Sequence, residues 1–513
     1  MIPTTRSKRE TDFDAGIFDE PFILFGDSRR HVDPKFGLMQ FGPFSLPGQP
    51  RSLSQIRVGI IGSATLVSDM QLWLTQCANP IYNDGGQPHG APYFPGFNSS
   101  HPFYCSIFTN PSLNVVLKEA ELKKLLLAPN FDERVTKIVK FYSDALQVLA
   151  GREPQPDVVI CCLPQEVVDT CVVDRKKPRK NKWWKKFGRR KKEDQFDLFL
   201  PSVEPSEEEE LLEHSNLRRG LKGAAMFHNF PIQIVWPKTI AQRNSTATGK
   251  STQDAATRAW NLMTALYYKA GGTPWRADGL DESTCYVGVS FFHDATEQSL
   301  VRTSMAQTFS ASGHGYVLRG SAFEWNSEEN GNSPHLDKNS ATQLLRDAIA
   351  LYTKQNGGAS PSRVVVHKSS KYWQEELAGF KEALTDIPNY DLVAFDSSGS
   401  LQLVRSGLYA PLRGTYVKLG IQKFLLYTVG YTPFLKTYQG PRIPMPLQVI
   451  EHYGDTPWSE LLAEVLCLTK MNWNSANFAS SDPITLAFSK KVGEILSELA
   501  VEITPRPEYR FYM

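Results

Sequence analysis

The sequence is short of the features that mark membrane-spanning, secreted and metal-dependent proteins. No stretch approaches the roughly 18 apolar residues that a membrane helix needs. The N-terminal residues lack the apolar run and the cleavage site of a secretory signal. The seven cysteines are odd in number and show no CxxC or Cys/His ligand spacing. We therefore expect a cytoplasmic protein with buried, reduced thiols and no contact with a membrane.

A strong charge of either sign is also missing. The 56 Lys and Arg residues against 54 Asp and Glu residues give a net charge of +2, which argues against a uniformly basic nucleic-acid binder. The distribution is uneven, however, because 12 of the 18 residues from 175 to 192 are Lys or Arg, interleaved with Trp183, Trp184 and Phe187. The acidic stretch 204–213 follows. We favour a solvated, partly disordered insertion, and the alternative is a loop that contacts a nucleic-acid backbone and stacks on bases.

The first half of the chain has the pattern of a doubly wound α/β domain. At roughly 150 residues per domain, 513 residues suggest about three domains. The continuous apolar runs 56–62 and 156–164 suit strands buried on both faces. Helical segments are expected at 68–76 and 119–149, between the two runs, so the order strand, helix, strand predicts a parallel layer. The pattern resumes with a helix at 217–227, a strand at 231–236 and a helix at 254–269.

The turn at 271–276 predicts a domain junction, because Gly and Pro residues follow a helix that ends in Lys. We expect a lead-in at 1–50, a first domain at 51–268 with a charged insertion near 172–215, and a second domain at 269–513. Strands are predicted in the second domain at 284–292, 315–318, 363–367, 390–395, 401–405 and 424–429. Helices are predicted there at 341–356, 373–383, 458–468 and 484–500.

Three cations and an amide form a candidate binding site. Arg218 and Lys222 are four residues apart on one predicted helix, so they share a face. Gln233 lies on the next strand, and Lys269 ends a helix before Gly-Gly. Such a set suits a terminal phosphate, which needs several donors and compact positive charge. From the spacing alone, scattered surface residues are the commoner explanation.

These segments resemble the junction of the MID and PIWI domains in Argonaute proteins. The order and length of the matches are similar to the short prokaryotic Argonautes, with no room for N-terminal and PAZ domains. The matching segments are Phe41-Gly-Pro-Phe44, Arg218-Arg-Gly-Leu-Lys222, Pro231-Ile-Gln233, and residues 267–276, 285–289, 427–433, 468–474 and 483–493.

The resemblance implies a Rossmann-like MID domain followed by an RNase H-like PIWI domain. It implies that Arg218, Lys222, Gln233 and Lys269 bind the 5′-phosphate of a guide strand. Arg218 departs from the commoner aromatic residue, and it could exchange stacking on the first guide base for an extra phosphate bond. The resemblance also implies a Mg²⁺ ion in this pocket, with the C-terminal carboxylate of Met513 as a ligand.

Slicing members of the family place acidic residues around two Mg²⁺ ions. The corresponding positions here are Ser290, Ser369 and Lys490. A hydroxyl is a poor replacement for a carboxylate, and a lysine repels Mg²⁺. The resemblance therefore predicts that this chain does not slice its target and is not itself an enzyme.

Other polar residues leave alternatives open. Asp294, Glu297 or Glu324 could form a rearranged metal site, although exposed loop acids are the better interpretation. Lys368 either contacts a backbone phosphate or is a plain surface lysine. Three histidines show no ligand spacing and are expected to be ordinary polar or core residues: His314, His367 and His452.

The function implied by the resemblance is guide-RNA-dependent recognition of single-stranded DNA from invading plasmids or phage. A separate partner with an APAZ domain would carry a TIR, sirtuin-like or nuclease effector, and target binding would activate it in prokaryotic immunity by abortive infection. One alternative is a guide-directed endonuclease with an unconventional metal site. Another is a scaffold for the partner with incidental nucleic-acid affinity.

Overall fold

The computed structural model describes most of the chain. It covers residues 14–50, 52–83, 92–172, 216–241, 253–293, 300–308, 315–325, 334–396, 401–407, 409–438, 443–497 and 505–513. The basic segment 175–192, the acidic stretch 204–213, Asp294, Glu297 and His314 lie outside these residues, and the side chain of Glu324 is not described. Among the described helices, none combines the length and apolar character required to cross a membrane.

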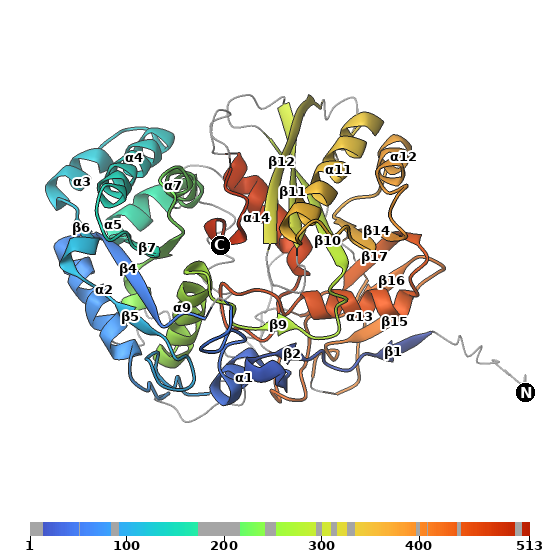
Figure 1. Cartoon of the computed structure of the whole chain (residues 1–513), viewed down its shortest axis with the longest axis horizontal. Helices are drawn as coiled ribbons and strands as arrows, with labels where there is room; N and C mark the ends of the chain where they lie inside the picture. The colour runs from blue at the N-terminus through green and yellow to red at the C-terminus, as the bar shows by residue number, and fades with distance from the viewer. Residues whose placement is uncertain are drawn as a thin grey trace, which may run out of the picture.

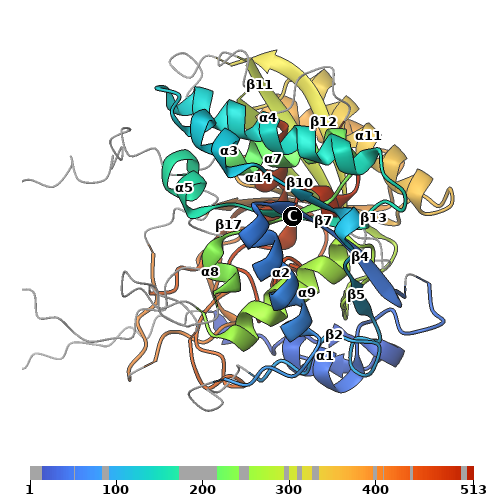
Figure 2. The ribbon, with the colours of Figure 1, turned by 90° about the vertical axis from the view of Figure 1, so that its left-hand side faces the viewer.

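The first lobe is a doubly wound sheet of parallel strands, as the sequence predicts. The strand order is β5–β4–β7–β8, and β6 also pairs with β4. Helices α2 and α9 pack on one face, and α4 and α7 on the other (Figure 2). The strands are β4 (Gln55–Gly62), β5 (Ser106–Phe108), β6 (Asn114–Val116), β7 (Val158–Cys162) and β8 (Ile232–Val235). The helices are α2 (Ala64–Cys77), α4 (Phe131–Ala150), α7 (Asn216–Phe227) and α9 (Ala255–Lys269).

The second lobe is built on a nine-stranded mixed sheet. Its order is β1–β15–β16–β17–β14–β13–β10–β11–β12, with parallel pairing in the centre, between β14, β13 and β10. Helices α11 (Lys338–Gln355) and α12 (Gln374–Ala383) cover one face, while α13 (Trp458–Leu468) and α14 (Ile484–Leu496) pack elsewhere on the sheet. The strands are β10 (Thr284–His293), β11 (Leu300–Thr308), β12 (Gly315–Glu324), β13 (Arg363–Lys368), β14 (Asn389–Asp396), β15 (Thr415–Lys418), β16 (Phe424–Leu426) and β17 (Leu447–Gly454).

The N-terminal lead-in pairs with strands from the second half of the chain. Strand β1 (Ala15–Ile17) pairs with β15, and β2 (Ile23–Leu24) lies between β3 (Arg30–His31) and β9 (Arg276–Ala277). Glu20 accepts from Arg413 at 2.9 Å and from Lys470 at 2.8 Å. Burial, partly offset by Glu20, lowers the pKa of Lys470 to about 8. Buried ion pairs thus fix the lead-in to the second lobe.

Two local predictions differ from the structure. The strand predicted at 401–405 is wrong: these residues are irregular, and Val404 is 96% exposed. The amide of Leu403 donates to the Tyr427 hydroxyl at 2.7 Å instead of to a neighbouring strand. The helix predicted at 119–149 is broken into α3 (Glu119–Leu126) and α4, because Pro129 interrupts it and Asn130 caps the second helix.

The two lobes lie side by side (Figure 1), and polar and aromatic contacts form the seam between them. The Trp275 indole donates to the backbone oxygen of Lys470 at 2.9 Å, and the Trp473 indole donates to the backbone oxygen of Trp275 at 3.1 Å. Trp473 also stacks on Tyr268, with 4.6 Å between ring centroids. Met513 lies in the same region, where α7 contacts α14. This seam brings residues from both lobes to one pocket.

Candidate functional site

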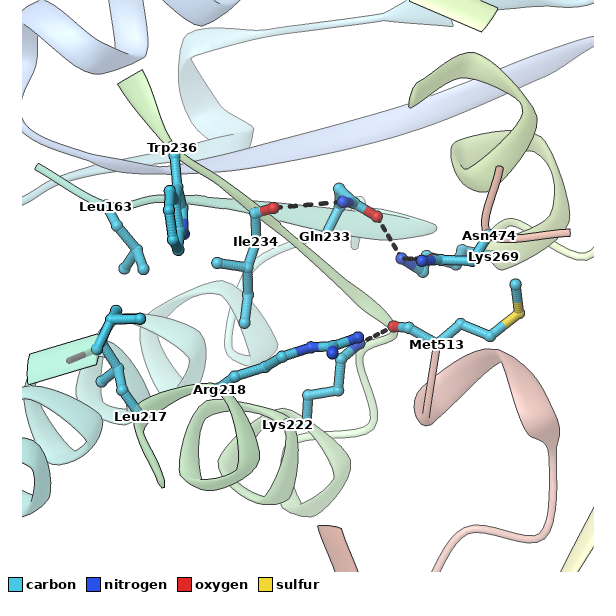
Figure 3. Close-up of a pocket in the computed structure, with 11 residues that line it drawn as sticks. Leu163, Leu217, Arg218, Lys222, Gln233, Ile234, Trp236, Lys269, Asn474 and Met513 are labelled. Carbon is cyan, nitrogen blue, oxygen red and sulfur yellow. Dashed lines mark hydrogen bonds between the residues drawn. The ribbon is translucent and has the colours of Figure 1, made fainter. Parts of the chain in front are cut away.

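A pocket at the seam gathers all four residues of the predicted cationic set. Arg218, Lys222, Gln233 and Lys269 line it together with Met513 (Figure 3). The remaining lining residues are Leu163, Val172, Leu217, Ile234, Trp236 and Asn474. Four separate segments therefore converge, although they are up to 295 positions apart in the chain (Met513 and Arg218).

Local structure aims each of these side chains at the pocket. Arg218 and Lys222 are one helical turn apart on α7, and Gln233 lies on the adjoining β8. Lys269 is the last residue of α9. The helix stops there because Gly271 adopts a φ of 108°, which favours glycine.

The pocket side chains form two sets of hydrogen bonds, one around Lys222 and one around Lys269. Lys222 Nζ donates to the backbone oxygen of Met513 and to that of Ile232, the latter at 3.3 Å. Lys269 Nζ donates to Gln233 Oε1 and, at 3.3 Å, to Asn474 Oδ1. These bonds hold the two ammonium groups in the same pocket.

The electrostatics of the pocket favour an anion. Lys222 and Lys269 are 2% and 1% exposed. Burial lowers the pKa of Lys222 well below its ordinary value, and the nearby charges of Lys269, Arg218 and Lys491 lower it further. Among the lining residues, no side chain is that of an Asp or a Glu, and the carboxylate of Met513 is outnumbered by the cations of Arg218, Lys222 and Lys269. A bound dianion would therefore stabilise the protonated form of Lys222.

The same lining does not fit a Mg²⁺ ion well. Mg²⁺ is held through carboxylates, phosphates and water, and within the described residues no cluster of three His, Cys, Asp or Glu side chains could hold a metal. The amide oxygens of Gln233 and Asn474 already accept from Lys269. Two lysines and Arg218 would repel a free dication. The sequence-based expectation of Mg²⁺ beside Met513 stays a prediction.

The positions expected to carry catalytic acids lie apart from this pocket. Val289 pairs with Lys368 in the parallel register, so Ser290 and Ser369 follow at the same edge of the sheet. Ser290 is buried and donates to the backbone oxygen of Ser489 at 2.7 Å. Ser369 is exposed. The absence of slicing stays a prediction.

Lys490 is exposed on α14, next to the Ser489 that accepts from Ser290. Its ammonium group pairs with Asp482 at 3.5 Å. Lys490 therefore directly follows the residue that accepts from the Ser290 hydroxyl. The resemblance would require a metal ligand at position 490, and this chain has a cation there.

Lys368 is neither a phosphate contact nor a surface lysine, the two interpretations that the sequence left open. It is fully buried, and its ammonium pairs with Glu376, so it is not available to a phosphate. It also donates to the backbone oxygen of Lys371 at 3.2 Å. The His367 ring bonds to the Thr485 hydroxyl at 2.7 Å, and the His452 ring bonds to Asp391 at 2.7 Å. Burial lowers the pKa of His367 to about 3, which suits a neutral core residue.

Sequence reasoning assigned no role to two pocket residues whose side chains carry a polar group, Asn474 and Trp236. Asn474 lies within the matching segment 468–474 but had no role assigned to it. Trp236 directly follows Gln233-Ile-Val, and a tryptophan beside a predicted polar site was a usable signal.

Comparisons with known proteins agree with this architecture. No protein-family model matches the chain. A stretch of 134 residues, 25% of the chain, is 31% identical to the Argonaute protein of Thermus thermophilus and covers 18% of it. The stretch shows homology to a part of that protein.

Solved structures extend the likeness to nearly the whole chain at the level of the fold. Clostridium butyricum Argonaute, bound to a guide DNA and a 19-mer target DNA, gives a TM-score of 0.63 at 15% identity over 97% of this chain and 54% of that one. The A. aeolicus Argonaute gives 0.55 at 14% identity, over 96% and 54%. Drosophila Piwi gives 0.57 at 12% identity, over 97% and 56%. The chain spans about half the length of these structures.

Proposed function

Because the chain is homologous to Argonaute proteins and has their MID-PIWI fold, we propose that it binds a guide RNA and uses it to recognise complementary single-stranded DNA. The first lobe corresponds to MID and the second to PIWI. The protein holds the guide terminus and backbone, while base pairing between guide and target supplies sequence recognition.

The convergence of Arg218, Lys222, Gln233 and Lys269 carries this proposal. Two buried ammonium groups, a guanidinium and two amides in one pocket match the charge and the many acceptor oxygens of a terminal phosphate. A guide that carries a 5′-phosphate places a dianion where the pocket has an excess of positive charge. A 5′-hydroxyl guide leaves that charge uncompensated.

We expect a 5′-phosphorylated guide RNA to bind at least about tenfold more tightly than the same RNA with a 5′-hydroxyl, since a hydrogen bond to a charged group contributes about 1.5 to 3 kcal/mol. Competition binding at fixed salt measures the ratio. Equal affinity for the two guides would refute the pocket assignment. It would favour the scaffold hypothesis, because a scaffold has no use for the terminal phosphate.

The target is proposed to be bound without being cut. Ser290, Ser369 and Lys490 replace the expected acids, and we expect no specific cleavage when the purified protein, a guide and a labelled DNA target are incubated with Mg²⁺ or Mn²⁺. A fragment of defined length, produced by this chain alone, would instead favour the guide-directed endonuclease. Loss of that fragment on dialysis against EDTA would identify a metal-dependent reaction.

We further propose that target binding activates a separately encoded APAZ-domain partner with a TIR, sirtuin-like or nuclease effector, in defence against plasmids or phage. The support is the resemblance of its motif segments to short prokaryotic Argonautes. Purification of the native complex, with sequencing of its nucleic acid and identification of its protein partner, tests this. Recovery of the chain with a guide but without a second protein would contradict it.

A further inference from the structure

Helix α14 lies between the sheet of the second lobe and the pocket at the seam. In Figure 1 it runs beside the C-terminus, between α7 and strands β10 to β12. It packs on β10 and β11, and it contacts α7, the helix that carries Arg218 and Lys222. Any shift of α14 would therefore change contacts in both lobes.

The spacing of residues along α14 gives this helix two faces with different partners. Thr485 and Ser489 are four residues apart, so they share one face, and both are fully buried. Phe488, Lys491 and Glu494 follow one another at intervals of three, which places them on another face. The first face meets the sheet of the second lobe, and the second meets α7 and the C-terminal residues.

Three contacts from the sheet hold the first face of α14. The His367 ring on β13 bonds to the Thr485 hydroxyl at 2.7 Å. The Ser290 hydroxyl on β10 donates to the Ser489 backbone oxygen at 2.7 Å. Gly288 lets the helix approach the strand closely, because a Cβ atom there would overlap the Thr485 backbone oxygen. Since these residues are buried, water does not compete for the two hydrogen bonds, and they fix α14 on the sheet.

The second face of α14 contacts the first lobe and the C-terminal residues. Glu494 pairs with Arg219 of α7 at 3.2 Å. The Phe488 ring packs on the Tyr509 ring with 3.7 Å between centroids, and on the Tyr512 ring with 6.2 Å. Both tyrosines are buried, so α14 helps to fix the last residues of the chain.

These contacts extend to the pocket at the seam. Met513 directly follows Tyr512, and its backbone oxygen accepts from Lys222 (Figure 3). Lys491 is one of the cations that lower the pKa of Lys222, so its ammonium group is near the pocket. The position of α14 therefore determines which charged and polar groups surround Lys222.

We propose that Ser290 is a positioning residue for the pocket at the seam, because its hydroxyl holds α14 on the sheet and α14 in turn places groups beside Lys222. The inference rests on the proposed 5′-phosphate binding and adds to it a residue of the other lobe. Ser290 does not line the pocket, so it acts on the guide only through the helix.

The chemistry of the contact explains why a hydroxyl suits position 290. The Ser489 backbone oxygen is an acceptor, so it requires a donor from β10. A serine hydroxyl supplies one, whereas an ionised carboxylate has no proton to donate. The serine at a position where the resemblance expects an acid therefore has a role of its own, in fixing α14.

The test measures the phosphate preference, which is the ratio of the affinities for a 5′-phosphorylated guide RNA and for the same RNA with a 5′-hydroxyl. Both guides are titrated at fixed salt into the wild type, Ser290→Ala and Ser290→Thr. Ser290→Ala should lower the preference by about 2- to 12-fold, the range that corresponds to the loss of one hydrogen bond. Ser290→Thr keeps a hydroxyl and should retain most of the preference.

Thr342→Val is the matched control for a general loss of stability. The Thr342 hydroxyl on α11 donates to the Gly379 backbone oxygen on α12 at 3.0 Å, so this variant also loses a buried bond between two elements of the second lobe. It should be destabilised much as Ser290→Ala is, yet keep the wild-type phosphate preference. An unchanged preference in Ser290→Ala, or an equal loss in Thr342→Val, would overturn the inference.

A second variant loosens α14 at its other buried hydrogen bond. Thr485→Val removes the hydroxyl that bonds to His367 and keeps the shape of the side chain. It should also lower the phosphate preference. If Ser290→Ala fails to fold, this variant decides, and a preference equal to that of the wild type overturns the inference.

The design separates this inference from the proposed function. A wild type that binds both guides equally would contradict the proposed function itself. A wild type with a phosphate preference that Ser290→Ala fully keeps leaves the proposed function standing and removes only the positioning role of Ser290.

Discussion

Replacement of Lys222 by alanine is expected to weaken binding of a 5′-phosphorylated guide by about 10- to 150-fold, because one charge-assisted hydrogen bond contributes about 1.5 to 3 kcal/mol. The ammonium group is 2% exposed, so solvent screens its interaction with a phosphate only weakly. Lys269→Ala should have an effect of the same size. The double variant should lose less than the sum of the two effects, since both lysines line one pocket and would contact the same phosphate.

A matched control separates this effect from a general loss of positive charge. Lys137 is an exposed lysine on α4 that pairs with Glu133 at 2.6 Å, and Lys137→Ala should leave guide affinity within about twofold. Guides with a 5′-hydroxyl should bind Lys222→Ala and the wild type nearly equally. A tenfold loss for both guides would mean that the substitution damaged the fold of the pocket and would contradict a specific phosphate contact.

Proton uptake gives a second readout for Lys222. Burial and the neighbouring cations lower its pKa in the free protein, and a bound phosphate raises the pKa again. Guide binding should therefore take up protons and weaken as the pH rises toward the ordinary lysine range. Calorimetry in two buffers of different ionisation enthalpy measures the uptake. Lys222→Ala should reduce it, which a merely structural role for Lys222 would not do.

The first lobe could be predicted from the sequence because its signals are local. Apolar runs such as 156–164 report strands buried on both faces, and helical spacing places α7 and α9 to within a residue. The prediction of one continuous helix at 119–149 failed, although Pro129 and the cap at Asn130 gave a local signal of the break. Three parallel strands with helices on both faces follow from this order of elements.

Several strands of the second lobe were missed because long-range pairing defines them. Strands β11 and β17 mix apolar and polar residues, and their identity as strands depends on neighbours β10 and β14. Residues 401–405 show the opposite error, since an apolar alternation with no partner strand stays irregular. Sheet membership is set by tertiary context, which a local pattern does not contain.

The candidate site could also be predicted only in part from the sequence. Family resemblance supplied Lys222 and Gln233, and the structure brings them together. The partners of Lys368 could not be foreseen, because Glu376 lies in the first turn of a later helix and binds the ammonium group in the core. A lysine beside a predicted strand end looks exposed in sequence, and only the packing of α12 shows otherwise.

Arg363→Ala is expected to lower the free energy of unfolding by about 3 to 5 kcal/mol, because removing one partner leaves buried charges uncompensated. Arg363 begins β13 and is 11% exposed at its side chain. It donates to Asp391 at 2.8 Å and holds Glu464 through two bonds, at 2.5 and 3.0 Å. Through these two carboxylates, Arg363 links the central strands to α13. Loss of Arg363 should therefore destabilise the centre of the second lobe.

The pH dependence of this destabilisation identifies its cause. Hydrogen bonds from His452 and Thr456, together with Arg363, lower the pKa of Asp391 to about 2, so its stabilising contribution is full above the ordinary pKa of 3.8 and is lost as the pH falls through about 2. Without Arg363 the buried carboxylates should gain protons at higher pH. Urea denaturation should therefore show a free energy of unfolding for Arg363→Ala that is far below the wild-type value at pH 7. This deficit should narrow on acidification toward pH 4.

Arg363→Lys should recover part of the deficit, since an ammonium keeps the charge but not the two-pronged geometry. A deficit below about 1 kcal/mol at pH 7, the size expected for an exposed pair such as Lys137 with Glu133, would show that Arg363 does not hold these strands together.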